Sequence, residues 1–387
     1  MSYYVKAKNI VLEDRVVKDS YLKINDDGKF GRVLKSIPKD SEVVDYSNYT
    51  IAPGLFDTHI HGYGSYDVMD NDIEGLNMMS EKLLSCGVTS FLPTTLTDSF
   101  EKTSSVLENI GKNYKDIDGA KIQGIFLEGP FFSEKFKGAQ NEKYMSPPSI
   151  DKLAKWDEAS NHLVRKIAIA PELEGSVDFI DWAVEHNIYV ALGHSDATFE
   201  EAKEAVEHGA NIFVHTFNAM SNLLHRHPSM VGAAFSLEDV YAELICDGHH
   251  NHPYSVNALL RARGIDQTVL ITDCMRAGGM GEGESSLGDF AVTIKDGTAK
   301  LKGTDTLAGS ILELILAVKN IVKWGFVSFD DALRMSSLYP AKSVGLDDLC
   351  GKIAYGRDAD FIVVDDEINL IATYLDGELR YEEGENK

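Results

Sequence analysis

A repeated pattern of strand and helix signals occupies most of the chain and limits the folds that it can adopt. Eight apolar, strand-like runs begin near residue 51, and amphipathic, helix-like stretches lie between most of them. The runs cover residues 50–61, 88–95, 121–130, 164–173, 188–196, 211–220, 240–250 and 268–279. Strands that alternate with helices form parallel sheets, and eight such units predict a (β/α)8 barrel of the TIM type.

One of the intervening stretches carries clear helix boundaries. Thr198 and Glu201 have the spacing of a capping box, and Gly209 stands where a helix usually stops. The amphipathic stretch between these signals is therefore predicted to be one of the helices that surround the barrel.

The two ends of the chain follow a different pattern. Residues 1–52 and residues 346–387 consist of short alternating runs separated by turn residues, which is typical of antiparallel strands. Two β-rich ends that flank one barrel suggest a small β-sandwich assembled from both termini. We therefore divide the chain into a barrel domain at 53–345 and a two-part sandwich domain at 1–52 and 346–387.

The composition indicates a protein of the cytoplasm. Of its 387 residues 44% are hydrophobic, yet no apolar run approaches the roughly 18 residues of a membrane span. The first residues, MSYYVKAKNIVLEDRV, lack the order of basic, apolar and small residues that marks a signal peptide. The four cysteines are spread along the chain without a CxxC pair, which is typical of reduced thiols.

The formal net charge of −24 limits the possible partners. Such a surface repels nucleic acid and anionic membranes, so we expect neither as a partner. An anionic substrate would need a local cationic pocket, because the overall field of the protein opposes its approach.

Ionisable side chains stand at the C-terminal ends of seven of the eight runs. In TIM barrels this end carries the active site, so the recurrence indicates a functional site rather than chance. The residues concerned are His59, His61, Glu128, Glu172, His194, His215, Asp247, His250 and Asp273.

The pair His59 and His61 raises the possibility of a metal site. Alternate residues of a strand share one face, so the two imidazoles would project together. Each histidine taken alone is more often a surface or hydrogen-bonded group, and a histidine pair can simply be a polar strand end. Together with His194, His215, Glu128 and Asp273, however, the pair forms a nitrogen and oxygen donor set that suits a divalent transition ion.

Other catalytic schemes find little support in the sequence. A GxSxG elbow, a Walker phosphate loop and a GxGxxG dinucleotide turn are all missing. Cys274 adjoins Asp273 but should point to the opposite side of its strand. The glycine-rich stretch 277–288 is predicted to be a mobile connection after the eighth run, although a loop there could close over a substrate.

At this point the chain resembles a known family. The motifs are PGLFDTHIHG, FLEGPF, LGHSDAT, VHTFNAM, DGHH, TDCMRAGG and GRDADFIVV. They are similar to motifs of the amidohydrolase superfamily and, within it, of the N-acetylglucosamine-6-phosphate deacetylase family. The similarity spans the whole chain, and LEGPF and HTFNAM are its most specific pieces.

The resemblance implies roles for the site residues. Glu128, His194 and His215 would bind one divalent metal ion, with zinc as the first candidate and iron or manganese as others. His59 and His61 would hold a second ion with Glu128 as a bridge, so one or two ions per subunit are expected. Asp273 would serve as the general base and acid and as a metal ligand, and His250 would polarise the substrate carbonyl.

The end of the fourth run differs in sequence from that of many other superfamily members. Relatives with two metals often use a carbamylated lysine near the end of that strand, where this chain has APEL with Glu172. This difference argues against an enzyme like dihydroorotase or hydantoinase. Glu172 itself is interpreted as a structural hydrogen-bond acceptor in preference to a catalytic group.

One short cationic segment could attract the anionic substrate that the net charge of the chain would otherwise repel. Arg226 lies between His225 and His227, and the forked guanidinium matches phosphate oxygens well. The resemblance implies that this arginine reaches the phosphate in the neighbouring subunit, and hence a homodimer. The backbone around Asn218 and Ala219 would add donors. In the alternative reading, Arg226 only pairs with a surface carboxylate.

The expected activity is metal-dependent hydrolysis of N-acetylglucosamine 6-phosphate to glucosamine 6-phosphate and acetate. Two alternatives stay open. The substrate could be another acetamido sugar phosphate, such as the galactosamine epimer. The barrel could also be a scaffold that has lost catalysis, although such scaffolds usually lose ligands and this chain keeps the full set.

Overall fold

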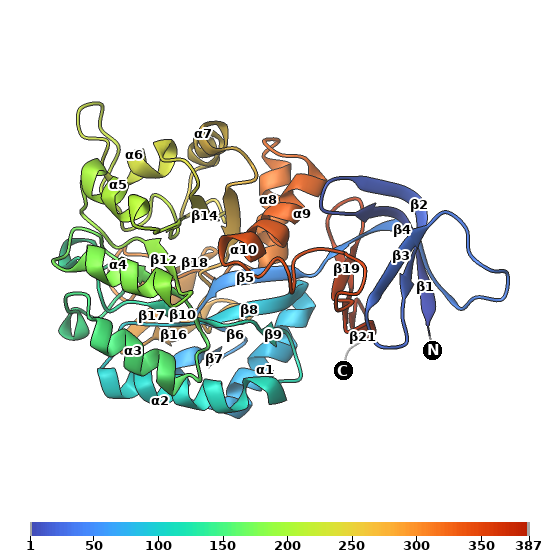
Figure 1. The fold of residues 1–387 in the computed structure, drawn as a ribbon, viewed down its shortest axis with the longest axis horizontal. Helices are drawn as coiled ribbons and strands as arrows, with labels where there is room; N and C mark the ends of the chain where they lie inside the picture. The colour runs from blue at the N-terminus through green and yellow to red at the C-terminus, as the bar shows by residue number, and fades with distance from the viewer. Residues whose placement is uncertain (1, 385–387) are drawn as a thin grey trace.

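Eight parallel strands form a barrel in the computed structural model, which describes residues 2–384 (Figure 1). In order along the chain and around the barrel they are β5 (Leu55–Ile60), β8 (Val88–Thr95), β10 (Ile125–Glu128), β11 (Val164–Ile169), β12 (Tyr189–Leu192), β13 (Ile212–Phe213), β14 (Tyr241–Ile245) and β15 (Thr268–Ile271). The backbone NH of Asp273 donates to the carbonyl of His59 at 2.9 Å, which joins the last strand to the first and closes the ring. The predicted (β/α)8 barrel is therefore confirmed.

The barrel strands are apolar runs because both of their faces are covered. All the residues of β5, β8 and β10 are buried, as expected for parallel strands between packed side chains and an outer layer of helices. That layer contains α1 (Ile73–Leu83), α2 (Phe100–Asn113), α3 (Ile150–Ala159), α4 (Ser176–Glu185), α5 (Phe199–Glu207), α6 (Ser229–Ser236), α7 (Pro253–Arg263), α8 (Leu314–Lys323), α9 (Phe329–Met335) and α10 (Leu338–Ser343).

Helix α5 shows how the local sequence sets these boundaries. Thr198 caps it, accepting from the backbone NH of Glu201 at 3.2 Å while the Glu201 carboxylate accepts from the NH of Thr198 at 2.8 Å. Gly209 follows the helix with φ of 107°, a conformation that suits glycine. The buried face carries Ala202 and Ala205, so the predicted helix and both of its ends are confirmed.

Both ends of the chain build one small β-domain beside the barrel (Figure 1). Its hydrogen-bonded order is β21 (Glu378–Glu382), β20 (Leu370–Leu375), β19 (Phe361–Val364), β4 (Val43–Pro53), β1 (Tyr3–Val11), β2 (Val16–Ile24) and β3 (Phe30–Leu34). Strand β4 pairs in parallel with β1 and antiparallel with β19, so N-terminal and C-terminal strands meet in its centre. A separate apolar core that includes Leu22, Phe30, Phe361 and Tyr374 fills this domain.

The stretch after the eighth barrel strand differs from the prediction. Residues 277–288 were expected to form a mobile connection, but their second half forms β16 (Gly283–Leu287). This strand pairs with β17 (Phe290–Lys295), which pairs with β18 (Thr298–Leu301), in a three-stranded antiparallel sheet. The sheet forms because Leu287, Val292 and Ile294 are buried together, a pattern that the glycines of the first half conceal.

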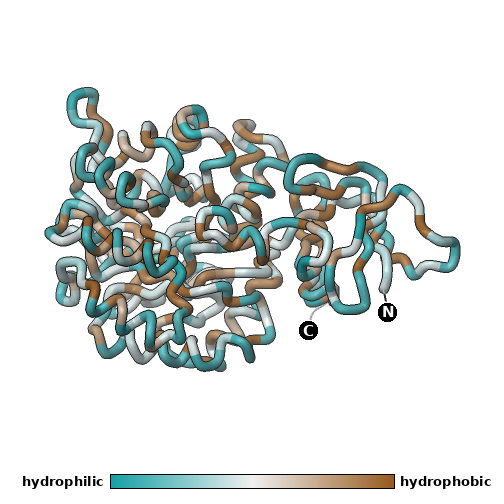
Figure 2. The backbone as a smooth tube through the Cα atoms, in the orientation of Figure 1, coloured by the Kyte–Doolittle hydropathy of each residue, from teal (hydrophilic) through white to brown (hydrophobic). Residues whose placement is uncertain are grey.

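The distribution of hydropathy follows this architecture. Hydrophilic segments lie mainly at the outer loops, and apolar segments recur through the interior of the molecule (Figure 2). No helix within residues 2–384 has both the length and the apolar character needed to cross a membrane.

Candidate metal centre and active site

Six of the predicted site residues meet at the C-terminal ends of the barrel strands. His59 lies on β5, His61 follows that strand, and Glu128 is the last residue of β10. His194, His215 and Asp273 each stand two residues beyond the ends of β12, β13 and β15. These last three residues have positive φ angles of 48°, 30° and 51°, which are uncommon for residues with side chains. Such strain is characteristic of functional sites, where it aims a side chain at a reaction centre.

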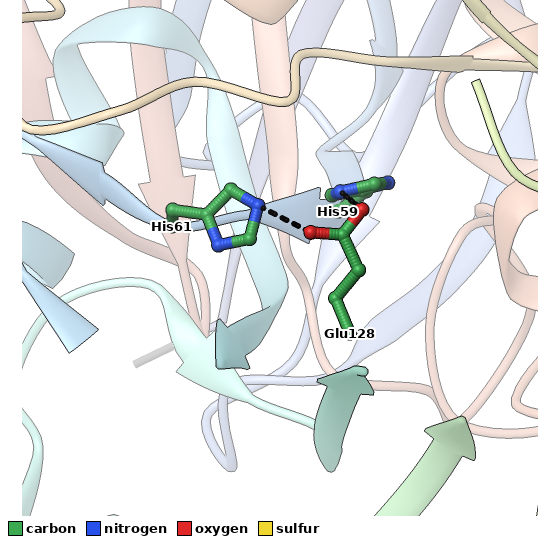
Figure 3. A group of neighbouring side chains, drawn as sticks. All are labelled: His59, His61 and Glu128. Atoms are coloured by element: carbon green, nitrogen blue, oxygen red, sulfur yellow. Dashed lines mark ion pairs between the residues drawn. The ribbon is translucent and has the colours of Figure 1, made fainter. Parts of the chain in front are cut away.

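Glu128 is the centre of the group. Figure 3 shows its carboxylate between the rings of His59 and His61, with Nε2 atoms 3.3 Å from Oε1 and 3.1 Å from Oε2, respectively. The Nε2 atoms of His194 and His215 lie 3.4 Å and 3.3 Å from the same Oε1. Two triads, each with donor atoms within 4.8 Å of one another, therefore share this glutamate.

Asp273 completes the side of the group that holds the histidine pair. Its Oδ1 lies 3.4 Å from Nε2 of His59 and 3.3 Å from Nε2 of His61. The Nε2 atom of His59 is buried and has no hydrogen-bond partner among residues 2–384, although it faces the oxygens of Glu128 and Asp273. A buried nitrogen without a partner is costly, and a cation between these donors would satisfy it. The residues present therefore fit a divalent metal ion.

The charges in the group shift the pKa values of its members. Burial alone would raise the pKa of Glu128, but the surrounding imidazoles hold it well below its usual value. Burial likewise opposes protonation of His59, yet the charges of Asp273 and Glu128 raise the pKa of its ring to about 9. Burial lowers the pKa of His215, which favours the neutral imidazole that a metal ligand must be.

The other ring nitrogen of each histidine is also engaged, which turns Nε2 toward the centre. Such outer contacts fix the tautomer and orientation of metal-ligating histidines. Three of the Nδ1 atoms contact backbone carbonyls: His194 that of Phe136 at 2.9 Å, His215 that of Asn218 at 3.1 Å and His61 that of Thr94 at 3.2 Å. The Nδ1 atom of His59 instead lies 3.3 Å from the carboxylate of Glu243.

A cavity of about 420 Å³ opens onto this group. Its volume lies within the usual range for a small-molecule site. Among its lining residues are His61, Glu128, His194, His215 and Asp273 of the group, and Asn218, Ala219 and His250, which were predicted to bind substrate. A larger cavity of about 660 Å³ lies away from these residues, and its Lys121 already pairs with Asp358, Asp360 and Asp376. We therefore place the chemistry in the smaller cavity.

His250 enters the cavity with a fixed ring. Its Nδ1 lies 2.7 Å from Oδ2 of Asp247, and the backbone NH groups of His249 and His250 donate to Oδ1 of the same aspartate at 2.8 Å. Burial would raise the pKa of Asp247, but the hydrogen bond from His250 and its charge lower it. Asp247 thus fixes the ring of a residue that lines the cavity.

Arg226 lies apart from these residues within one chain. It is exposed in the loop between β13 and α6, and its Nη1 lies 3.0 Å from Nε2 of His225. It does not line the cavity of its own chain. Its role at the site of a neighbouring copy remains a prediction.

Glu172 has a structural place. It accepts from the hydroxyl of Ser195 at 2.7 Å and from the backbone NH of Asp196 at 2.6 Å, and so fastens the loop that follows His194. Burial raises the pKa of Glu172. These contacts agree with its interpretation as a hydrogen-bond acceptor.

Three residues at the site escaped the sequence analysis. Gln140 donates to Oε2 of Glu128 at 2.6 Å and accepts from the NH of Thr97 at 2.9 Å, but a lone glutamine in a loop gives no signal. Lys166 and Glu243 form a buried ion pair beneath His59. Glu243 is the one charged residue of β14, whereas Lys166 follows Arg165 in β11, so the sequence carries only a weak signal for the pair.

Comparison with known proteins identifies the family. A sequence profile of the Amidohydrolase family matches residues 50–380. The chain belongs to this family.

Relatives of known activity match almost the full length. An N-acetylglucosamine-6-phosphate deacetylase of Vibrio furnissii is 35% identical over 97% of this chain and 94% of the relative. One of Bacillus subtilis is 34% identical over 98% of this chain and 97% of the relative. An N-acetylgalactosamine-6-phosphate deacetylase of Escherichia coli O157:H7 is 33% identical over 98% of this chain and 99% of the relative.

Solved structures agree with the fold. The N-acetylglucosamine-6-phosphate deacetylase of Thermotoga maritima superposes with a TM-score of 0.88 at 33% identity, covering 99% of this chain and 100% of that one. A variant of the Mycobacterium smegmatis enzyme in complex with N-acetyl-D-glucosamine-6-phosphate gives a TM-score of 0.93 at 26% identity, covering 98% and 99%. As a member of the amidohydrolase family with this ligand set, the protein has a site for a divalent metal.

Proposed function

We propose that this amidohydrolase removes the acetyl group from N-acetylglucosamine 6-phosphate and releases glucosamine 6-phosphate and acetate. The observation that carries the proposal is the group of four imidazoles with the carboxylates of Glu128 and Asp273, which adjoins a cavity of about 420 Å³. Two N-acetylglucosamine-6-phosphate deacetylases that match almost the full length are 34–35% identical to the chain.

The donor set assigns ligands to one or two ions. Glu128, His194 and His215 would hold the first ion, and His59, His61 and Asp273 would hold a second one with Glu128 as the shared ligand. Imidazole nitrogens with carboxylate oxygens suit zinc, iron or manganese, with zinc as our first choice. When bound, a divalent ion supplies a Lewis acid that activates water near neutral pH and polarises a carbonyl.

Asp273 is assigned the proton transfers. Burial would raise the pKa of its carboxyl, but the charge of His59 and the hydrogen bond from His61 hold it below its usual value, so it is ionised at neutral pH. The carboxylate can therefore accept the proton of the attacking water and return it to the amine that leaves. One residue that lines the cavity thus serves as base and then as acid.

His250 is assigned to the carbonyl oxygen. The Asp247 carboxylate holds Nδ1 and so orients the ring, which would donate from Nε2 to the developing oxyanion. A hydrogen bond aimed at charge that develops during the reaction stabilises the transition state more than the substrate.

The phosphate needs a cation in a chain of net charge −24. We assign the backbone around Asn218 and Ala219, which line the cavity, and Arg226 of a neighbouring copy. Exposure of Arg226 in a loop outside its own cavity supports a homodimer in which each copy completes the other's site. We also assign the protein to the cytoplasm, since all four cysteines are free thiols.

A second substrate is favoured by one observation. The relative from Escherichia coli that is 33% identical over 98% of this chain acts, by its name, on N-acetylgalactosamine 6-phosphate. This sugar differs from the first at one hydroxyl only, and the same cavity would hold it.

The test is acetate release from both sugar phosphates and from unphosphorylated N-acetylglucosamine, before and after chelation and return of zinc, iron or manganese. We expect phosphate-dependent activity that disappears with the chelator and returns with metal. The ratio of kcat/KM for the two sugar phosphates decides between the epimers. A metal-loaded protein that is inactive on all three sugars would overturn the proposed function.

A further inference from the structure

A lysine is buried inside the barrel beneath the proposed second metal site. Lys166 lies on β11 and its side chain is 0% exposed. Its Nζ forms an ion pair with Glu243 of β14, lies 3.4 Å from the carbonyl of Thr58 and sits 3.8 Å from the centre of the Phe126 ring. The Glu243 side chain is 1% exposed, so both charges are removed from water.

Stability alone does not account for this pair. Removing two charges from water is expensive, and replacing such a pair with well-packed apolar side chains is often neutral or stabilising. The ring of Phe126 covers one side of the Lys166 ammonium group, where no polar partner among the described residues compensates the charge. The pair therefore calls for a role in the site above it.

Glu243 connects the lysine to a metal ligand. Its Oε1 contacts Lys166, while Oε2 lies 3.3 Å from Nδ1 of His59. An acceptor at Nδ1 keeps the proton there and leaves the lone pair of Nε2 free to bind a cation. The Nε2 of His59 is one of the buried atoms that lack a hydrogen-bond partner in the described part of the chain.

This dependence sets His59 apart from the other three imidazoles. Backbone carbonyls hold the Nδ1 atoms of His61, His194 and His215. Backbone atoms cannot be removed by substitution, whereas the acceptor for His59 is a side chain whose place depends on Lys166. The first triad, Glu128 with His194 and His215, makes no use of the pair.

We propose that Lys166 and Glu243 form a positioning pair for the ion at His59 and His61. Glu243 orients the ring of His59, and Lys166 holds Glu243 in place and balances its charge. The pair leaves the ion of the first triad unaffected. This inference rests on the proposed metal function, and it identifies two residues that control occupancy of the second site without touching substrate.

The test compares two uncharged double variants of the full chain. In Lys166→Met/Glu243→Gln the amide oxygen can still accept a hydrogen bond from Nδ1 of His59. In Lys166→Met/Glu243→Met, position 243 offers no acceptor for that hydrogen bond. Neither variant leaves a lone buried charge. The two side chains at position 243 have similar size, so packing differs little between the variants.

The readout is the number of zinc ions per chain at graded free zinc concentrations, with the parent protein alongside. We expect the Met/Met variant to bind the second ion roughly 10- to 100-fold more weakly, with the first ion unchanged. The Lys166→Met/Glu243→Gln variant should bind the second ion almost as tightly as the parent does. Arg334→Met removes a buried cation on α9 that contacts Asp330 and Asp331, and as a control it should bind both ions normally.

Three outcomes would overturn the proposal. The parent could bind only one ion, or the parent and the Lys166→Met/Glu243→Met variant could bind the second ion with equal affinity. Both double variants could also lose the same amount of affinity for the second ion. If the Met/Met variant fails to fold, nitrogen-15 histidine spectra of the metal-loaded parent decide. The His59 signal, assigned by its loss in His59→Gln, must show a proton on Nδ1, and a proton on Nε2 contradicts the pair. A parent that binds two ions but releases no acetate refutes the deacetylase function and leaves the pair standing.

Discussion

The Nδ1 atom of His250 lies 2.7 Å from Oδ2 of Asp247, three residues earlier in the chain. The same aspartate accepts two backbone NH groups at its other oxygen, so its position is fixed by the loop after β14. The contact orients the His250 ring. Asp247 is therefore as important to the orientation of His250 as Glu243 is to that of His59.

Asp247→Asn should lower kcat for acetate release by roughly 10²-fold, the usual cost of weakening one donor to an oxyanion. The amide can still accept a hydrogen bond from Nδ1 of His250 but makes a weaker contact than the charged carboxylate. Because Asp247 belongs to neither ligand triad, metal content should equal that of the parent. Unchanged kcat with normal metal content would remove His250 from the mechanism.

Asp273→Asn should lower kcat by roughly 10²- to 10⁴-fold, because the amide cannot accept and return the proton. The ion held by Glu128, His194 and His215 should stay bound, since these ligands are unchanged. Steady-state kinetics and metal analysis on the same preparation check both points. Substantial residual turnover would assign the proton transfer to another group.

Arg226→Ala should raise KM for the phosphorylated sugar by roughly 10- to 100-fold, the value of a hydrogen bond to a charged group. Metal content should not change, because Arg226 lies outside the cavity of its own chain. Arg15→Ala is a matched control, since Arg15 is also exposed and pairs only with Asp14 in the described structure.

Mixing two variants tests whether Arg226 acts across a dimer. Arg226→Ala and Asp273→Asn subunits, reassembled together, should regain activity at one of the two sites of each mixed dimer. That site combines a native Asp273 with an Arg226 from the other copy. Activity no higher than the average of the separate variants would place the phosphate contact elsewhere.

Zinc uptake should release protons near neutral pH. In the metal-free protein the charges of Asp273 and Glu128, acting against burial, raise the pKa of His59 to about 9. Below that pH the ring holds a proton that an ion must displace, so zinc affinity should rise with pH up to about 9. Calorimetry in two buffers with different ionisation enthalpies counts the protons released.

The same pKa predicts how the metal-free protein responds to pH. A histidine with a raised folded-state pKa contributes stability that is complete below its unfolded value, near 6.5, and is lost as pH rises through 9. The melting temperature of the metal-free protein should therefore fall over this window, and His59→Gln should flatten the change. A melting temperature independent of pH across that range in the parent would contradict the assignment.

The barrel and the ligand group were predictable because their signals are local. Each ligand lies at or just beyond the end of an apolar run, and parallel strands bring those ends together whatever the packing details are. The contact of Lys166 with Glu243 joins strands that are not neighbours in the barrel, so no local pattern reveals it. The sheet that starts at Gly283 was missed because its buried partners, Val292 and Ile294, lie beyond the glycine-rich segment.

The small β-domain places a constraint on synthesis of the chain. Strand β4 leaves the ribosome early and can pair with β1, but its other edge waits for β19, which is among the last segments made. Until then the backbone of residues 50–53 is an open edge that can pair with other chains. Truncation before Phe361 should therefore cause insolubility while leaving every ligand of the metal centre in the sequence.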